Sequence, residues 1–340
     1  MELIFHTFDL PLLHPFTISR ETITVQSTLI VELRDGDFSG FGEATTNAYY
    51  DATIEKMCEA LEAVREAVES SGWENPEQLF DQLDEKLTAC PFAQCALDMA
   101  AHDLWGKKLG QPVWKLWGLN CESNVPSNYT IGIDEIPIMV EKMQEFANWP
   151  IYKIKLGTDQ DIDIVRELRQ HTDAAFRVDA NCAWSADETI KNSHELKALG
   201  VQFIEQPMAA ELVEEMPRVK QHSVLPLMAD ENCIERTDVA KCQHGFDGIN
   251  IKLVKCGGMT PARRMINQAR ELGLKVMIGC MTESTVGISG IAQLLPMLDY
   301  VDMDGAALLS SDIASGAQVV NGICRYPDLG GNGVRLNSAT

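Results

Sequence analysis

The stretch that decides the fold is IYKIKLGTDQD at residues 151–161, an apolar run that carries two lysines and ends in polar residues. In a strand, Lys153 and Lys155 would point to the same face, because successive side chains alternate. Two ammonium groups on one buried face repel each other and lose their hydration, so a protein needs a reason to keep them. Alone, the doublet also fits an exposed amphipathic strand. The neighbouring segments therefore decide whether this is a functional pair of lysines or an exposed strand.

Beyond residue 127, short apolar strands alternate with polar helical segments of ten or more residues. We predict eight strands, at residues 127–133, 151–157, 175–180, 201–207, 226–231, 248–254, 275–281 and 300–305. Eight parallel βα units close into a (β/α)8-type barrel. The sequence therefore predicts an α/β fold with the barrel over residues 121–320.

The first 120 residues have a different pattern. Strands alternate up to about residue 45, with two of them joined at the turn Asp35-Gly36-Asp37, and apolar residues then recur at helical spacing over residues 51–70 and 91–108. We expect an N-terminal α+β capping domain over residues 1–120. Residues 321–340 are rich in Gly and Pro without a helical period, and we expect this segment to pack back on the capping domain.

The composition narrows the classes of partner. The chain of 340 residues has 28 Lys and Arg against 50 Asp and Glu, a net charge of −22, which argues against nucleic acid or an anionic membrane and favours a small molecule. The N-terminus lacks the features of a signal peptide and no run is apolar enough to span a bilayer, so we expect a cytoplasmic protein. The ten cysteines form no C-x-x-C pair. A homo-oligomer is left open.

Polar residues recur at the carboxyl ends of the predicted strands. Successive members of the first five are separated by 22 to 26 residues, the length of one βα unit, so all return to the same rim of the barrel, where active sites lie. These residues are Lys155, Asp179, Glu205, Asp230 and Lys252, followed on the last strand by Asp302 and Asp304.

Three of these rim residues are carboxylates on consecutive strands. Asp179, Glu205 and Asp230 would converge on one sector of the mouth, and each would raise the pKa of the others unless a cation lies between them. Oxygen ligands without His or Cys favour Mg²⁺ over zinc. Any one of the three could be a solvated turn residue or a helix cap, but three in register predict a Mg²⁺ site.

The two rim lysines would face each other across the barrel. Lys155 ends the second strand and Lys252 the sixth, so a substrate at the centre would have an ammonium-bearing side chain on each face. This arrangement can remove a proton from one face of a carbon and return one to the other, provided that a metal stabilises the enolate. Lys153 would lower the pKa of Lys155 toward the working pH, which explains the doublet.

With these features in place, the chain resembles the enolase superfamily, in particular its muconate lactonizing enzyme subgroup. The resemblance is carried by GFGEA at 40–44, ALDMAAHDLWGKKLGQPVWKLWG at 96–118, KIK at 153–155, VDAN at 178–181, IEQP at 204–207, ADEN at 229–232 and INIKLVKCGG at 249–258. It implies that Lys155 and Lys252 are the acid/base residues. It also implies Mg²⁺ ligands at Asp179, Glu205 and Asp230, supported by Asn181 and Gln206. Lys255 is a rival to Lys252, but the family register, five residues before the Gly-Gly pair, selects Lys252.

The last strand bears on the reaction. In VDMDG, Asp302 and Asp304 share a strand face across from the metal, and two carboxylates there would bind a cation such as a substrate α-ammonium. An ammonium at one end and a metal-bound carboxylate at the other describe a dipeptide. D-x-D on this strand resembles the signature of the dipeptide epimerases, which include the L-Ala-D/L-Glu epimerases of cell-wall peptide salvage. A capped turn or a surface acid pair is the alternative.

Besides Lys153, Asp302 and Asp304, three further residues are expected to touch the substrate. Arg20, in the loop HPFTISRET, lies where related enzymes fold a cap loop over the site and could pair with a glutamate side chain, although it is offset by about one position from the usual cap arginine. Thr130, on the first strand, and Glu283, after the seventh, are the other two, and Glu283 fits a supporting acid equally well.

We therefore expect a Mg²⁺-dependent dipeptide epimerase that inverts the α-carbon of the C-terminal residue by two-base 1,1-proton transfer, with L-Ala-D/L-Glu as the first substrate to try. The alternatives within the superfamily are an N-acylamino acid racemase with o-succinylbenzoate synthase activity and a muconate-type cycloisomerase. These bind no substrate ammonium, so Asp302 and Asp304 count against them. A non-catalytic barrel that serves as a binding protein would be expected to have lost at least one member of the site.

Overall fold

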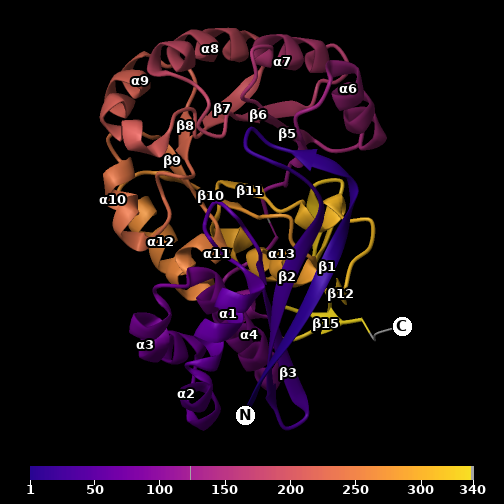
Figure 1. Cartoon of the computed structure of the whole chain (residues 1–340), viewed down its shortest axis with the longest axis vertical. Helices are drawn as coiled ribbons and strands as arrows, with labels where there is room; N and C mark the ends of the chain where they lie inside the picture. The colour runs from indigo at the N-terminus through magenta and orange to yellow at the C-terminus, as the bar shows by residue number, and fades with distance from the viewer. Residues whose placement is uncertain (123, 338–340) are drawn as a thin grey trace.

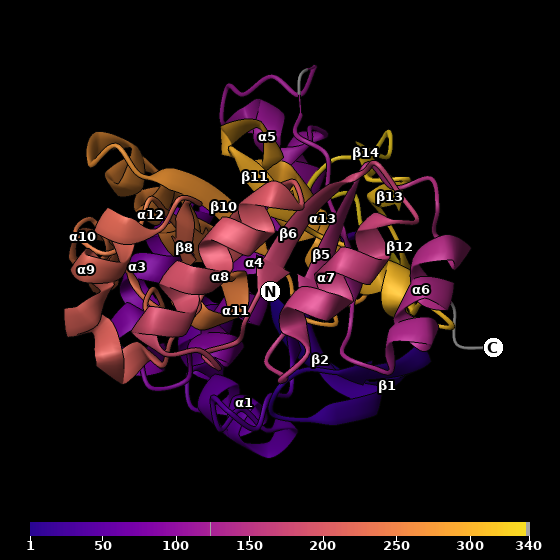
Figure 2. The ribbon, with the colours of Figure 1, turned by 90° about the horizontal axis from the view of Figure 1, so that it is seen from above.

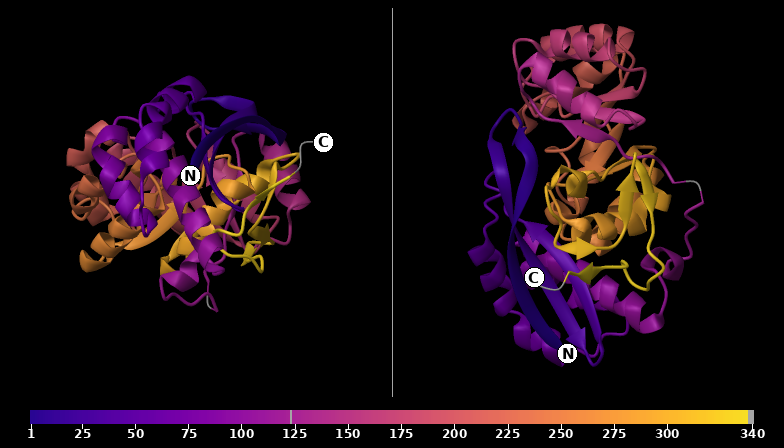
Figure 3. Two further views of the ribbon diagram at one scale, coloured as in Figure 1. Left: turned by 90° about the horizontal axis from the view of Figure 1, so that it is seen from below. Right: turned by 90° about the vertical axis from the view of Figure 1, so that its right-hand side faces the viewer.

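The structure is a computed structural model that describes residues 1–122 and 124–337 (Figure 1). It begins with an antiparallel sheet of three strands, β1 (Glu2–Thr17), β2 (Thr22–Asp35) and β3 (Phe38–Thr45). The predicted turn between β2 and β3 is confirmed, and Gly36 adopts φ +59° there, a conformation that L side chains rarely adopt. The long ribbon of β1 and β2 extends from this domain along the side of the barrel (Figure 3).

Four helices follow: α1 (Ile54–Glu62), α2 (Arg65–Ser70), α3 (Pro76–Leu87) and α4 (Pro91–Leu109). Helix α3 was not predicted, although its sequence carries two helix-start signals. Asn75 accepts a hydrogen bond from the backbone N–H of Gln78, and Pro76 occupies the first turn. Helix α4 is buried on almost every face. Gly40 and Gly42 allow β3 to lie directly on it, since a Cβ at these positions would come within 2.3 Å and 2.0 Å of backbone oxygens of α4.

The barrel contains the eight predicted strands. They are β4 (Tyr129–Ile131), β5 (Ile151–Lys155), β6 (Ala175–Asp179), β7 (Val201–Glu205), β8 (Leu227–Ala229), β9 (Gly248–Ile251), β10 (Lys275–Gly279) and β11 (Tyr300–Asp302). Each strand pairs in parallel with the next along the chain, and a parallel bridge between Ser127 and Val301 connects the last strand to the segment before the first. The predicted (β/α)8-type barrel with a capping domain is confirmed.

Helices surround the barrel on the outside (Figure 2). The longer ones are α6 (Ile136–Glu145), α7 (Asp161–Arg169), α8 (Ala186–Ala198), α9 (Met216–His222), α12 (Met259–Glu271) and α13 (Thr285–Leu294), and the shorter ones are α5 (Val113–Leu116), α10 (Val239–Cys242) and α11 (Leu253–Cys256). None of the helices in the described part of the chain has an apolar stretch long enough to cross a bilayer.

The C-terminal segment forms two small antiparallel pairs, β12 (Ala314–Ser315) with β15 (Arg335–Leu336) and β13 (Gln318–Val320) with β14 (Ile323–Arg325). It contacts α4 of the capping domain. The backbone N–H of Asn332 donates to Asp103 Oδ1 at 2.7 Å, and Lys107 Nζ donates to the carbonyl of Val334 at 2.7 Å. These contacts connect the end of the chain to its N-terminal half.

The interior of the barrel is layered. Phe203, Met228 and Met277 form an apolar plug at the amino-terminal end of the strands, with Tyr300 packed against them. Arg177 lies over the plug, 5.4 Å from the Phe203 ring and 5.2 Å from the Tyr300 ring, and donates to Asn128 and to the carbonyl of Val301. A polar layer therefore supports the rim from below.

Glu43, from the GFGEA segment on β3, joins the capping domain to the barrel. Its buried carboxylate accepts hydrogen bonds from Ser284 Oγ at 2.6 Å, Ser284 N at 3.0 Å, Gly287 N at 2.8 Å and Thr28 Oγ1 at 2.9 Å. Two of these donors are backbone N–H groups at the start of α13, which have no partner within the helix. Glu43 thereby caps a barrel helix from the other domain.

We expect Glu43→Ala to lower the free energy of unfolding by about 2 to 4 kcal/mol, because it leaves buried donors without an acceptor. Urea unfolding followed by circular dichroism measures this change. Glu59→Ala, an exposed residue on α1, is the matched control and should change stability by less than about 0.5 kcal/mol. Equal effects of the two substitutions would contradict the capping role.

Candidate active site

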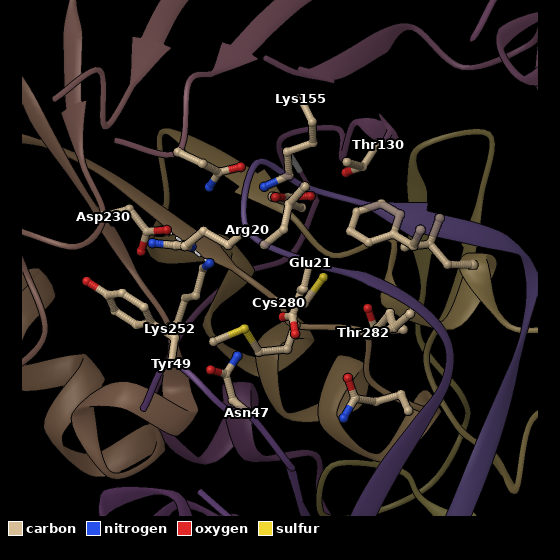
Figure 4. Close-up of a pocket in the computed structure, with 18 of the residues that line it drawn as sticks. Arg20, Glu21, Asn47, Tyr49, Thr130, Lys155, Asp230, Lys252, Cys280 and Thr282 are labelled. Atoms are coloured by element: carbon tan, nitrogen blue, oxygen red, sulfur yellow. Dashed lines mark ion pairs between the residues drawn. The ribbon is translucent and has the colours of Figure 1, made fainter. Parts of the chain in front are cut away.

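A cavity of about 380 Å³ opens at the carboxyl ends of the barrel strands (Figure 4). The barrel contributes the rim residues, and the capping domain covers them with two loops, residues 18–21 and 47–50. Side chains that line the cavity include Arg20, Tyr49, Thr130, Lys153, Lys155, Asn181, Asp230, Glu231, Lys252, Asp302 and Asp304.

The three predicted metal ligands lie together. Asp179 ends β6, Glu205 ends β7 and Asp230 follows β8, and one oxygen from each lies within 4.8 Å of the other two. All three are buried. Burial, and then the charge of Asp179, raises the pKa of Glu205 above its usual range, which is the expected cost of gathering carboxylates. Three oxygens in this span fit around one Mg²⁺, whose oxygen ligands lie at about 2.1 Å.

Each predicted acid/base lysine contacts a different carboxylate of this cluster. Lys155 Nζ lies 2.7 Å from Asp179 Oδ2, and Lys252 Nζ lies 3.0 Å from Asp230 Oδ2. Burial alone would lower the pKa of Lys252, but the charge of Asp230 more than offsets it, so its pKa is raised. The two lysines come from β5 and from the end of β9, and Figure 4 shows them reaching the cavity from different sides.

Lys255, the rival to Lys252, lies outside the lining of the cavity. Its fully buried Nζ donates to Asp230 Oδ1, to the carbonyl of Asp230 at 2.7 Å and to the carbonyl of Cys233 at 3.3 Å. Lys255 therefore holds Asp230 from behind.

Lys153 lies below Lys155 on the same face of β5, as expected, and it contacts three carboxylates. Its Nζ lies 2.8 Å from Glu205, 2.9 Å from Asp302 and 3.3 Å from Asp179. Burial alone would lower the pKa of Lys153, yet these three carboxylates raise it well above its ordinary value. Lys153 thus bridges the three-carboxylate cluster and the last strand.

Asp302 and Asp304 both line the cavity. Asp302 accepts hydrogen bonds from Asn128 Nδ2 at 2.7 Å and from Lys153, while Asp304 accepts one from the backbone N–H of Thr130. Burial, and then the charge of Asp302, raises the pKa of Asp304 well above its ordinary value. A cation beside this pair would relieve that cost.

Arg20 reaches the cavity, but Glu231 already holds it. Arg20 Nη2 lies 2.7 Å from Glu231 Oε1, and its guanidinium carbon lies 4.3 Å from the centre of the Tyr49 ring. Ser19 Oγ in the same loop donates to the carbonyl of Asn181. These contacts hold the cap loop against the side of the rim that carries the three-carboxylate cluster.

The two supporting residues implied by the resemblance contact different ligands. The backbone N–H of Asn181 donates to Asp179 Oδ1 at 2.9 Å. Gln206 Oε1 accepts from the backbone N–H of Asp230 at 3.0 Å and of Asn232 at 3.2 Å. Asn181 lines the cavity, whereas Gln206 lies behind it and fixes the chain at Asp230.

Thr130 and Glu283 differ in their access to the cavity. Thr130 lines it and donates its backbone N–H to Asp304. Glu283 is buried outside the lining, where it accepts from the backbone N–H of Met281, and its neighbour Thr282 takes the place expected for it. Burial, and then the charge of Glu43, raises the pKa of Glu283 to about 8. The geometry therefore favours the supporting alternative for Glu283.

Two family models match this chain. "Mandelate racemase / muconate lactonizing enzyme, N-terminal domain" covers residues 3–118, and "Enolase C-terminal domain-like" covers residues 138–340. The chain belongs to the enolase superfamily. The resemblance inferred from its motifs is confirmed.

Relatives within the enolase superfamily cover almost the whole chain. An L-Ala-D/L-amino acid epimerase of Flavobacterium johnsoniae is 55% identical over 336 residues, which are 99% of this chain and 100% of the relative. An L-Ala-D/L-Glu epimerase of Bacteroides thetaiotaomicron is 39% identical and covers 98% of this chain and 88% of the relative. A solved dipeptide epimerase of Enterococcus faecalis, complexed with Mg and L-Leu-L-Tyr, has a TM-score of 0.91 at 28% identity and covers 98% of each chain.

Three residues of this enolase-superfamily site escaped the sequence analysis. Asn250 donates to Glu205 Oε1 at 2.8 Å, Asn128 donates to Asp302, and Glu231 holds Arg20. Strand alternation could have identified the first two, because Asn250 lies two residues before Lys252 and Asn128 two before Thr130. Glu231 follows Asp230 directly, so its place at the rim could also have been inferred.

Proposed function

We propose that the chain is a Mg²⁺-dependent dipeptide epimerase that inverts the α-carbon of the C-terminal residue. The observation that carries this proposal is that Lys155 and Lys252 reach one cavity from different sides, each beside a different member of a three-carboxylate cluster. The names of the two relatives support L-Ala dipeptides as the substrate class, with L-Ala-D/L-Glu among them.

The lysines carry the proton transfer. In one direction the neutral amine of one lysine takes the α-proton while the ammonium of the other delivers a proton to the opposite face, and the roles exchange in the reverse direction. Asp179, Glu205 and Asp230 would hold Mg²⁺, which when bound stabilises negative charge on the substrate carboxylate. Solved relatives complexed with Mg and a dipeptide, from Enterococcus faecalis at 28% and Methylococcus capsulatus at 30% identity, support this cofactor.

Asp302 and Asp304 would receive the substrate α-ammonium. Burial and the charge of Asp302 make a charge on Asp304 costly, and a bound cation removes that cost. Asp302 already forms an ion pair with Lys153, whereas the donors that the described residues offer to Asp304, the Thr130 N–H and the Cys280 thiol, carry no charge. An N-acylamino acid racemase, an o-succinylbenzoate synthase and a muconate-type cycloisomerase bind no substrate ammonium, so they do not require this pair of carboxylates. A binding protein transfers no proton, so it does not require the two lysines.

The cellular setting belongs to the same proposal. All ten cysteines are free, which suits a reducing compartment and supports a cytoplasmic enzyme. Salvage of cell-wall peptides would supply small L-Ala dipeptides to such an enzyme.

Asp304→Asn should lower kcat/KM for free dipeptides about ten- to a hundredfold, because it removes a buried charge-assisted contact worth about 1.5 to 3 kcal/mol. N-acetylation of the dipeptide removes the matching positive charge and should cost the parent enzyme a similar factor. The same acetylation should cost Asp304→Asn much less. Kinetics on paired free and acetylated substrates measures both effects.

Asp299→Asn, at the opposite end of β11, is the control and should keep the parent's penalty for acetylation. If the parent turns over N-acetylated substrates as fast as free dipeptides, these aspartates do not bind an ammonium, and the racemase alternative gains.

A further inference from the structure

Arg20 and Glu231 form an ion pair over the mouth of the cavity that the catalytic proposal does not use. The pair joins Nη2 to Oε1 at 2.7 Å, and the Glu231 side chain is only 2% exposed. Tyr49 stacks against the guanidinium. Both charged side chains line the cavity, so a bound ligand meets a nearly neutral pair rather than a free cation.

Glu231 has a second oxygen that the protein leaves without a partner. Its Oε2 is buried and accepts no hydrogen bond from any described residue. An unpaired buried carboxylate oxygen is costly, and because Glu231 lines the cavity, a turn of its side chain would bring this oxygen to a hydrogen-bond donor on a ligand. Arg20 is held through one terminal nitrogen, and a guanidinium carries five N–H donors in all. One unpaired acceptor and the remaining guanidinium donors therefore belong to the same ion pair.

The side chain of the C-terminal residue lies next to this pair, because the other directions around the α-carbon are occupied. In the proposed reaction the α-carboxylate lies at Asp179, Glu205 and Asp230, the N-terminal residue lies toward Asp304, and the lysines occupy both faces of the α-carbon. Lys153 and the barrel interior close the site from below. The remaining direction is the cap, where Arg20 and Tyr49 lie.

We infer that the Arg20–Glu231 pair determines specificity, selecting a C-terminal residue with an uncharged amide side chain, such as glutamine, over the corresponding carboxylate. An amide can donate to Glu231 Oε2 and accept from Arg20 together. A carboxylate can only accept, and it would place its charge next to that of Glu231, which offsets the attraction of Arg20. This inference rests on the proposed function and names the substrate class for it.

The test compares kcat/KM for L-Ala-L-Gln and L-Ala-L-Glu, which differ only in this group. The parent should prefer the Gln dipeptide by about tenfold. The Glu dipeptide loses one hydrogen bond to the charged Glu231, and its side chain is also repelled by that charge. Glu231→Gln frees Arg20 and should shift the ratio toward the Glu dipeptide by about ten- to a hundredfold, as a charge-assisted hydrogen bond predicts. Glu211→Gln removes an equal charge from an exposed position near Tyr49 and should leave the ratio unchanged.

Arg20→Gln provides a second variant that leaves the neighbour of the metal cluster intact. It removes the attraction to a carboxylate and leaves the charge of Glu231 unpaired, so it should raise the preference for Gln above that of the parent. A tenfold preference of the parent for the Glu dipeptide that Arg20→Gln abolishes would overturn the inference, as would an unchanged ratio in folded Glu231→Gln. If the parent neither turns over nor binds either dipeptide by calorimetry, the proposed function itself fails and the inference with it. A shifted ratio on an active enzyme tests the inference alone.

Discussion

Lys155→Ala and Lys252→Ala should each lower the rate of epimerisation by roughly 10²- to 10⁴-fold, the contribution of a positioned acid or base. The two variants should fail in different ways. Each lysine serves one face of the α-carbon, so each variant keeps exchange with solvent for the stereoisomer whose proton faces the surviving lysine. Mass spectrometry in deuterated water, started separately from each stereoisomer, measures this one-sided exchange.

Lys275→Ala is the matched control, because Lys275 is exposed at the amino-terminal end of β10, away from the rim. It should exchange both stereoisomers as the parent does. Exchange of both stereoisomers in Lys155→Ala or Lys252→Ala would contradict the two-base scheme, since one lysine would then reach both faces.

Removal of divalent metal should abolish epimerisation, and Mg²⁺ should restore it. Asp179, Glu205 and Asp230 bring oxygens within 4.8 Å of one another in a buried site, an arrangement that a bound cation stabilises. Glu205→Gln removes one ligand charge and should weaken Mg²⁺ binding by at least about a hundredfold, because even residues that only support ligands contribute about 10- to 100-fold.

Calorimetric titration of Mg²⁺ into the metal-free protein measures this affinity without reference to activity. Asp37→Asn, in the exposed turn of the capping domain, should bind Mg²⁺ like the parent. Full activity after exhaustive chelation, or an unchanged Mg²⁺ affinity in Glu205→Gln, would show that these carboxylates do not form a metal site.

The spacing of the strand ends predicted the position of the rim residues because one βα unit returns the chain to the same end of the barrel. This rule needs no knowledge of side-chain contacts. It placed Lys155, Asp179, Glu205, Asp230 and Lys252 around one mouth. In the structure Lys155, Asp230 and Lys252 line the cavity, and Asp179 and Glu205 lie buried in one cluster with Asp230. Contacts between the capping domain and the barrel have no regular spacing in the sequence that could predict them. Arg20 and Glu231 are 211 residues apart, and only the folded capping domain brings the cap loop to the rim.

Charge compensation inside the barrel was the second feature beyond the reach of the sequence. The doublet of Lys153 and Lys155 predicted repulsion, but Lys153 also contacts carboxylates from three different strands. Strand alternation indicates which residues point inward, as it does for Asn250, but it does not say which of them touch across the barrel. Those contacts depend on the tilt of the strands and the length of each side chain.

The most direct test of the central claim is deuterium incorporation by the parent enzyme with Mg²⁺. Stereochemically pure L-Ala-L-Glu and L-Ala-L-Gln are incubated separately in deuterated water, and the products are separated by stereoisomer. The proposed function predicts a single deuterium at the α-carbon of the C-terminal residue of each epimerised product, and none at the N-terminal residue. The absence of deuterium from both dipeptides, with incorporation into N-acylamino acids under the same conditions, would contradict it.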